Sequence, residues 1–452
     1  MRPHPQFMAA LRREFSDWQL WAGRALVIGF AVITGLTVVG FTWLTEHALA
    51  QFSSVQKVHW WAPLLWMPIS TAAIVWLTLR FAPGTAGSGI PQVMAALEPE
   101  VQGPERSLFV SLRLSVAKVA LTTWGLLAGL SLGREGPCVQ IGAGIMHHAR
   151  RWMPKGSRVS DHGLLIAGGA AGIAAAFNTP LGGVMFAIEE LAKNPEQRSS
   201  GLILAAIVIG GMMSVSVYGN ASYFGVIRVE NFGSNLILPG LLVVVCSGIA
   251  GGLFSRLLAV SLAGRSPDWF SKFRRKFPVK FAAACGLLVA ILGVVSQGAT
   301  YGSGYGHTRS ILEANGEGFS FYVLFKFIAT WLTTWSGVPA GIFAPSLAIG
   351  GALGNDIAQL TSYANAPTLV ALGMAGFLAA VTQAPLTAFI IVMEMVDGHA
   401  LVLSLMATAM VASRISRLIG PPLYSTLADL QLLRLPSNSI QKKGAPKGSK
   451  FN

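Results

Sequence analysis

Apolar segments long enough to enter a lipid bilayer follow one another along this chain, and glycine and proline breaks fall inside several of them. The first segment, 25–44, has about the 20 residues that a membrane helix needs. Later segments are broken at Asn178-Thr179-Pro180, at Gly337–Gly341 and at Gln383-Ala384-Pro385. Lipid cannot bond the backbone groups that such breaks release, so the breaks must be buried in protein or line a watery cavity. Broken helices at membrane depth are typical of transporters and channels.

Composition excludes the soluble classes. Hydrophobic residues make up 53% of the 452 positions and charged residues only 12%, against roughly 25% charged residues in soluble domains. The same numbers exclude intrinsic disorder. We therefore predict an all-α polytopic membrane protein. The further apolar runs are 61–82, 107–132, 163–192, 201–218, 235–262, 279–297, 320–335, 341–361, 367–396 and 399–413.

Basic residues predict which loops face the cytoplasm. The formal net charge is +14, which on a soluble protein would suggest nucleic acid. On a membrane protein, Lys and Arg gather in cytoplasmic loops. The protein is thus expected to cross the inner (plasma) membrane several times, with both termini cytoplasmic and no nucleic-acid partner. The clusters are Arg2, Arg12 and Arg13; Arg150, Arg151, Lys155 and Arg158; Arg265, Lys272, Arg274, Arg275, Lys276 and Lys280; and Lys442, Lys443, Lys447 and Lys450.

Two stretches of the chain repeat. The segment 168–181 aligns with 373–386, so that Pro180 matches Pro385 at a spacing of 205 residues (385 − 180). The same spacing takes Glu189 to Glu394. A second match aligns the segment that begins at Glu135 with the one that begins at Phe343. Shared Ala and Gly bias is the alternative explanation, but it does not produce the common Pro-Leu-x7-Glu spacing. Such repeats indicate duplicated halves with a substrate site between them.

Three short motifs combine a glycine, a possible helix start and a proline in the first turn. They are Gly87-Ser-Gly-Ile-Pro91, Gly133-Arg-Glu-Gly-Pro137 and Gly341-Ile-Phe-Ala-Pro345. Proline is favoured in the first helical turn. The free N–H groups and the dipole of a helix N-terminus can hold an anion without a full countercharge. Three such ends that converge at the membrane midplane would form a site of chloride size.

These motifs resemble the signatures of the CLC family of chloride channels and chloride/proton antiporters. Gly420-Pro-Pro-Leu-Tyr424-Ser resembles the family's fourth element, and the likeness runs from about residue 25 to 430. The resemblance implies a homodimer with one pore per subunit, and two inverted-topology repeats of tilted and broken helices in each subunit. The expected division is 1–22 cytoplasmic N-terminal segment, 23–235 first repeat, 236–418 second repeat, 419–436 C-terminal helix carrying Tyr424, and 437–452 disordered cytoplasmic tail.

The resemblance implies that five residues besides Glu135 bind a central anion. Ser88 and Tyr424 would donate hydroxyl protons to it, since a hydroxyl can turn toward an anion without adding charge. Ile342 and Phe343 would contribute backbone N–H groups, and Gly136 belongs to the same set. A helix N-cap is an alternative, compatible role for Ser88. An interfacial aromatic is the alternative for Tyr424.

Glu135 is the sharpest functional candidate. A carboxylate at membrane depth is costly and is a functional residue by default. Ionised, it can occupy an anion site; protonated, it can leave and let chloride take its place. One side chain could thus act as gate and proton acceptor. The alternative is an ion pair with Arg134, although Arg134 is better explained as a source of positive potential or a structural bond.

Two further charged positions match the family. Glu190 corresponds to the glutamate that accepts cytoplasmic protons in the antiporters and is commonly apolar in channels; a solvated helix end beside Lys193 is the alternative. Glu189, paired with Glu394, is predicted to be a repeated structural residue. Lys118 matches a lysine thought to raise the anion potential. The carboxylates that often follow the first motif are Gln92 and Met94 here, which leaves the partner of Lys118 open.

The predicted function is exchange of chloride for protons, with Glu135 as gate and Glu190 as internal proton acceptor. The alternative is a passive voltage- or pH-gated chloride channel of the same fold. Family members that prefer nitrate tend to place proline at the position of Ser88, which favours chloride here. Neither an enzyme motif nor a metal-ligand pattern is present, so we expect no enzymatic activity, no metal and no cofactor, with chloride bound as substrate. Gly302-Ser-Gly-Tyr-Gly306 lacks the Lys-Ser/Thr ending of a phosphate loop and is predicted to be a turn.

Overall fold

The computed structural model describes residues 18–154, 159–192, 201–219, 223–225, 234–264, 266–313 and 321–433. The tail predicted at 437–452, and residues 1–17 of the predicted N-terminal segment, lie outside this range. Within it, all regular structure is helical, and the only β-type contact is an isolated bridge between Gly133 and Gly341. Seven of the described helical segments are long and apolar enough to cross a membrane. The prediction of an all-α polytopic membrane fold is confirmed.

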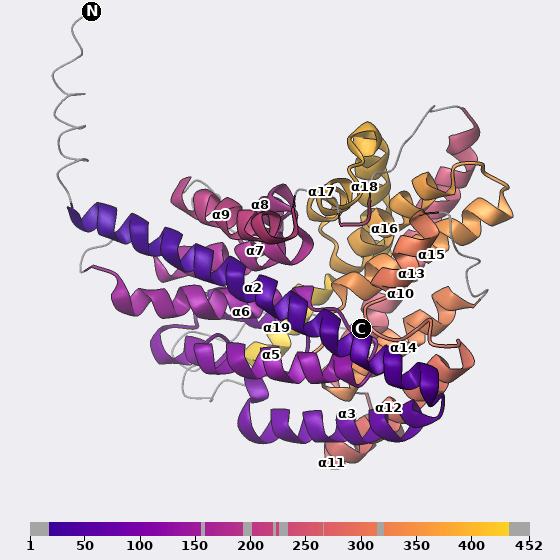
Figure 1. Cartoon of the computed structure of the whole chain (residues 1–452), viewed down its shortest axis with the longest axis horizontal. Coiled ribbons are helices and arrows are strands. Elements are labelled where there is room, and N and C mark those ends of the chain that lie inside the picture. The colour runs from indigo at the N-terminus through magenta and orange to yellow at the C-terminus, as the bar shows by residue number, and fades with distance from the viewer. Residues whose placement is uncertain are drawn as a thin grey trace, which may run out of the picture.

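The helices form two groups that meet in the middle of the molecule (Figure 1). The first group runs from α2 to α9, the second from α10 to α18, and α19 returns to pack on α4 of the first group. The first group comprises α2 (Trp18–Val58), α3 (Ala62–Phe81), α4 (Ile90–Leu97), α5 (Leu112–Leu127), α6 (Glu135–Ala149), α7 (Asp161–Phe177), α8 (Pro180–Phe186) with a π-helical extension η4 (Ala187–Leu191), and α9 (Gly201–Tyr218). The second comprises α10 (Ile237–Ala263), α11 (Trp269–Lys276), α12 (Pro278–Val295), α13 (Tyr305–Leu312), α14 (Tyr322–Ser336), α15 (Phe343–Leu360), α16 (Ala366–Thr382), α17 (Pro385–Met395) and α18 (Val402–Ile419). The last helix, α19, spans Leu423–Leu432.

The two predicted breaks near residues 180 and 385 have the same geometry. Asn178 ends α7 in the left-handed conformation, with φ of 57°, and Pro180 starts α8. Gln383 ends α16 in the same way, with φ of 60°, and Pro385 starts α17. Proline fits the first helical turn because its missing N–H has no partner there anyway. The repeat read from the sequence is therefore a repeat of structure.

Glycines at matching positions let the helices of each half cross closely. A Cβ atom on Gly168 of α7 would lie 2.3 Å from the carbonyl oxygen of Gly142 in α6. In the second half, a Cβ atom on Gly373 of α16 would lie 2.1 Å from the carbonyl oxygen of Gly350 in α15. Small residues allow backbones to approach where lipid supplies no hydrophobic drive for helix association. Two backbone-to-backbone crossings thus fix the core pair of helices in each half.

Two glutamates join the halves by reciprocal capping. The Glu189 carboxylate accepts hydrogen bonds from the N–H groups of Leu386 and Thr387, at 3.1 and 2.6 Å, at the start of α17. The Glu394 carboxylate accepts from Leu181 and Gly182, at 3.2 and 2.7 Å, at the start of α8. A carboxylate is stabilising at a helix N-terminus. The prediction that this pair is structural is confirmed, and Figure 1 shows α8 and α17 side by side where the two groups meet.

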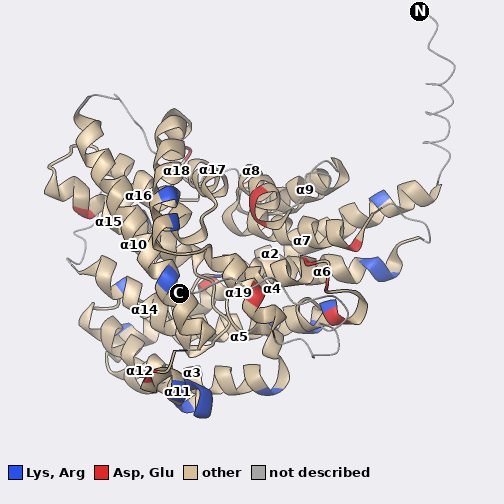
Figure 2. Ribbon diagram, turned by 180° about the vertical axis from the view of Figure 1, so that it is seen from behind, with Lys and Arg blue, Asp and Glu red and all other residues tan. Residues whose placement is uncertain are grey.

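The short helix α11 marks one membrane face. It connects the end of α10 with the start of α12, both of which can span a membrane. Its N-cap is Asp268, whose carboxylate accepts from the N–H of Ser271 at 2.8 Å, and this bond holds the pKa of Asp268 below its ordinary value. Its exposed side chains combine basic and aromatic residues, which suits the lipid headgroup region; they include Trp269, Phe270, Lys272, Arg275 and Lys276. Figure 2 shows this concentration of basic residues beside α3 and α12.

The glycine crossings generate a prediction about stability. Gly168→Ala and Gly373→Ala should each lower the free energy of unfolding by about 1–3 kcal/mol, because the added methyl group would overlap a backbone oxygen that cannot move. Gly29→Ala is the matched control, since nothing lies within 4 Å of its Cβ position in α2. Thermal unfolding of the purified variants measures the difference. Equal unfolding temperatures for all three would contradict close packing at the crossings.

The reciprocal caps generate a second prediction. Glu394→Ala should destabilise the protein by about 1–2 kcal/mol, because two N–H groups at the start of α8 lose their acceptor. Glu394→Gln should cost less, since the amide oxygen still accepts. Glu313→Ala is the control: it breaks an exposed ion pair with Arg309, and such pairs contribute little. If Glu394→Ala and Glu313→Ala unfold at the same temperature, the caps do not stabilise the fold.

Candidate functional site

The second and third motifs are held together by their backbones. The N–H of Gly133 donates to the carbonyl of Gly341 at 2.8 Å, and the N–H of Gly341 donates back at 3.0 Å. A Cβ atom on Gly341 would lie 2.7 Å from the Gly133 oxygen, so a side chain here would push the strands of this bridge apart. The bridge places the start of α6 beside the start of α15. The non-helical segments at Gly133 and Gly341 thus supply hydrogen-bond partners to each other, as burial at membrane depth requires.

The first motif joins the same cluster. The N–H of Gly87 donates to the carbonyl of Val338 at 3.2 Å, and the N–H of Ala340 donates to the carbonyl of Gly87 at 3.1 Å. Gly89, with φ of 109°, is the N-cap of α4. A Cβ atom on Gly89 would lie 2.6 Å from the carbonyl oxygen of Gly136, so the starts of α4 and α6 touch. The structure therefore brings all three predicted helix N-termini together.

Two hydroxyl groups without partners lie in this cluster. Ser88 is 6% exposed and Tyr424 is 1% exposed, and neither hydroxyl has a hydrogen-bond partner among the described residues. A Cβ atom on Gly136 would lie 2.3 Å from the Ser88 Oγ, and the Tyr424 hydroxyl lies near that of Ser88. A buried hydroxyl that finds no partner is costly. An anion between them would satisfy both hydroxyl groups.

Aromatic side chains wall the cluster. Phe343 starts α15, is 1% exposed and stacks on the ring of Tyr424, with 6.1 Å between ring centroids. Phe177 and Phe186, which belong to the first half, lie against the ring of Phe343, with 6.0 and 6.4 Å between ring centroids. Ile342, the N-cap of α15, is 2% exposed. These side chains keep water away from the helix starts, and interactions with the helix dipoles gain strength in such a surrounding.

Glu135 lies where an anion would be expected. It is the first residue of α6 and is 1% exposed, and the backbone N–H groups of Arg134, Glu135 and Ala344 face its carboxylate. Its Oε2 atom has no hydrogen-bond partner within the described parts of the chain. A Cβ atom on Gly133 would lie 2.4 Å from that oxygen. The carboxylate thus occupies the joint N-terminal end of α6 and α15.

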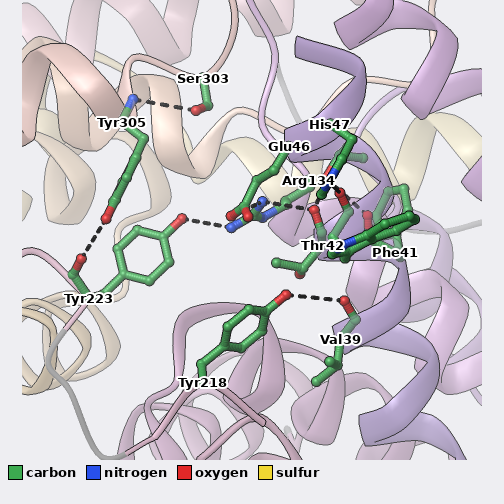
Figure 3. A network of polar contacts seen from close by, with 12 residues as sticks. Val39, Phe41, Thr42, Glu46, His47, Arg134, Tyr218, Tyr223, Ser303 and Tyr305 are labelled. Carbon is green, nitrogen blue, oxygen red and sulfur yellow. Dashed lines mark hydrogen bonds and ion pairs between the residues drawn. The ribbon is translucent and has the colours of Figure 1, made fainter. Parts of the chain in front are cut away.

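Arg134 pairs with a residue that the sequence analysis did not identify. Its guanidinium donates to the Glu46 carboxylate at 2.9 Å and to the Tyr223 hydroxyl at 3.0 Å. Figure 3 shows these contacts, together with the bond from the Tyr305 hydroxyl to the Tyr223 carbonyl at 2.9 Å. The ion pair with Glu135, weighed as an alternative, is not formed. Arg134 and Glu46 line a cavity of about 840 Å³.

Lys118 binds backbone oxygens. Its ammonium group donates to the carbonyls of Thr85 and Gly87, at 2.8 and 2.6 Å, and the residue is fully buried in α5. Gln92 takes over the role of a helix cap, since its side-chain oxygen accepts from the N–H of Gly89 at 2.9 Å. Lys118 therefore fixes the turn that presents Ser88.

Glu190 lies on η4, the π-helical end of α8. Single π-helical turns are often found at functional sites. Here the wider turn carries two successive glutamates with different partners: Glu189 caps α17, while Glu190 interacts with Tyr424. The Lys193–Arg198 loop beside it falls outside the described residues. No group of three His, Cys, Asp or Glu residues that could hold a metal occurs in the part of the chain described.

Sequence reasoning missed one repeated element. Lys326 of α14 is fully buried and donates to the carbonyls of Thr300 and Gly302, at 2.9 and 2.7 Å, which is the arrangement of Lys118. Its spacing from Lys118 is 208 residues (326 − 118), the spacing between Pro137 and Pro345 (345 − 137). This equal spacing could have identified Lys326 as the counterpart of Lys118 from the sequence alone. The turn predicted at 302–306 is present only as far as Gly304, because Tyr305 and Gly306 are the first residues of α13.

Comparison with known proteins agrees with this geometry. The family model described as voltage gated chloride channel matches residues 69–417. The H(+)/Cl(-) exchange transporter ClcA of Citrobacter koseri is 35% identical over 92% of this chain and 90% of its own, and that of Salmonella agona is 33% identical over 94% and 91%.

Among solved structures, a slow cyanobacterial Cl-/H+ antiporter superposes with a TM-score of 0.78 at 26% identity, covering 91% of this chain and 98% of that one. A CLC-type fluoride/proton antiporter shares the fold, with a TM-score of 0.73 at 24% identity over 91% and 99%. With three helix starts meeting at a buried carboxylate and with relatives that span nearly its whole length, the chain belongs to the CLC family.

Proposed function

We propose that this protein exchanges chloride for protons across the membrane, as the names of its relatives state for those proteins. The observation that carries the proposal is the position of Glu135. Its carboxylate, 1% exposed, lies at the shared N-terminal end of α6 and α15, where the helix dipoles favour negative charge. The same place suits a chloride ion, so carboxylate and chloride compete for one site.

This competition couples the two ions. While Glu135 is ionised, it holds the place of the anion and blocks the path. When it takes up a proton, its charge no longer matches the helix ends, and chloride can replace it. The N–H groups of Gly136, Ile342 and Phe343 and the hydroxyls of Ser88 and Tyr424 would then bind the chloride. Each passage of chloride past the gate would thus require a change in protonation of Glu135.

Glu190 is proposed to hand protons to this gate from the cytoplasmic side. Both Glu190 and Glu135 lie near enough to Tyr424 to act on its hydroxyl electrostatically. A passive voltage- or pH-gated chloride channel is the competing function. In that case Glu135 would still open and close the path, but Glu190 would have no proton to deliver.

The proposal extends to location and assembly. The basic face at α11 is proposed to be cytoplasmic, as are both termini, in an inner (plasma) membrane. A homodimer is proposed from the family resemblance. The protein is a transporter in this proposal, with chloride and protons as its substrates, and it needs no enzymatic activity, metal or cofactor.

Purified protein in liposomes tests the exchange directly. A chloride gradient should drive protons against their own gradient in the wild-type protein. In Glu135→Gln, chloride should still cross while proton pumping is lost, because the neutral amide mimics the protonated gate and carries no proton. Wild-type protein that moves chloride without protons would be a channel. Proton pumping by Glu135→Gln would remove Glu135 from the mechanism.

A second variant separates the two proton residues. Glu190→Gln should abolish proton movement while chloride flux persists, because the anion path through Ser88 and Glu135 stays intact. Glu189→Gln is the matched control: it removes the same charge one residue away, and its amide oxygen can still cap α17. Normal chloride/proton coupling in Glu190→Gln would refute the assignment. Equal loss in both variants would show that the fold of η4, not the acid, matters.

A further inference from the structure

The turn at Gly302–Gly306 repeats the structure of the first motif. Gly304 and Gly89 both have positive φ, 88° and 109°, and each is the N-cap of an eight-residue helix, α13 and α4 respectively. Ser303 stands where the first motif has Ser88. The similarity therefore includes the serine, the glycine cap and the helix start that form the first-half site.

The lysines below the two turns match as well. Lys118 donates to the carbonyls of the residues three and one before Ser88, and Lys326 donates to those three and one before Ser303. Both lysines are fully buried. Each ammonium group gathers backbone oxygens on one side of its turn.

The second turn opens to the opposite membrane face from α11. α12 starts next to α11 and can cross the membrane, and Ser296 directly follows its last residue. Ser296 lines the 840 Å³ cavity together with Ser303, Gly306 and His307. If α11 is cytoplasmic, this cavity is the outer entrance. Arg134, the residue that precedes Glu135, also lines this cavity.

The start of α13 offers donors and no free acid. The first N–H groups of a helix have no partner within it, and Gly306 and His307 supply two of them at the cavity wall. The Ser303 Oγ accepts from the Tyr305 N–H at 3.3 Å (Figure 3), which leaves the hydroxyl proton of Ser303 available as a donor. The Glu46 carboxylate in this cavity is paired with Arg134.

A buried hydroxyl points independently to a ligand. Tyr322 is 2% exposed, and its hydroxyl finds no partner among the residues that the structure describes. A Cβ atom on Gly304 would lie 2.8 Å from the Tyr322 oxygen, so this hydroxyl lies at the N-cap of α13. The ring of His307 stacks on Tyr322 with 3.7 Å between centroids and holds it there. Tyr322 thus has the burial and the missing partner that mark Tyr424 in the central site.

We propose that the start of α13, with Ser303, Tyr322 and the N–H groups of Gly306 and His307, is a second anion site. It would take a small monovalent anion such as chloride at the outer entrance, before the ion reaches Glu135. The inference rests on the proposed function, since it assumes that the matching first-half turn binds chloride. Lys326 is a positioning residue in this site, because it holds the turn and does not contact the anion.

Crystals soaked in bromide test the site, since bromide has the charge and nearly the size of chloride and is located by anomalous scattering. We expect one peak among the starts of α4, α6 and α15, and a second at the start of α13. The first peak without the second would overturn this inference and leave the proposed function standing. Absence of both would contradict the anion site on which the proposed function depends.

Variants assign the second peak to its residues. Tyr322→Phe should raise the bromide concentration for half occupancy at α13 about fivefold, the effect of one hydrogen bond worth about 1 kcal/mol, with the central peak unchanged. Ser88→Ala should weaken the central peak alone. Tyr301→Phe is the control, because Tyr301 lines the cavity beside α13 but its hydroxyl already donates to the carbonyl of Ala290. Equal α13 occupancy in Tyr322→Phe and Tyr301→Phe would exclude a role for Tyr322.

Discussion

The need to satisfy every backbone polar group inside a membrane governs this structure. A broken helix frees N–H and carbonyl groups that lipid cannot bond. Here the breaks pair with one another: Gly133 exchanges two hydrogen bonds with Gly341, and Gly87 bonds to Val338 and Ala340. Two buried lysines, Lys118 and Lys326, bind further carbonyl groups at the turns that precede α4 and α13. The N–H groups at the helix starts are not used in these bonds, and they are the groups that can bind an anion in the site.

Much of the fold could be read from the sequence because its signals are local. The breaks after Phe177 and Thr382 follow from a proline three positions past the helix end, and both were confirmed. The repeat could be found because Pro180 and Glu189 recur at one spacing in Pro385 and Glu394. What the sequence could not give was the partner of each glutamate, since a spacing does not say that each half caps a helix of the other.

The candidate site was predictable where a motif carried it and not elsewhere. Glu135, Ser88 and the helix starts lie in compact motifs, and the structure brings them together. Glu46 and Tyr223 lie 88 and 89 residues from Arg134 and in no motif, so only the folded chain shows them as its partners. The turn at Gly302–Gly306 was interpreted by comparison with phosphate loops. Comparison with the chain's own first motif would have been more informative.

The reciprocal caps of Glu189 and Glu394 bear on how a chain like this could have originated. Each half contributes one acid and one uncapped helix start, and each needs what the other supplies. Two identical copies of a single half, arranged about a twofold axis, would complete each other through the same pair of contacts. Gene duplication and fusion would then have preserved an interface that already existed between separate subunits, and the boundary between them survives inside one polypeptide.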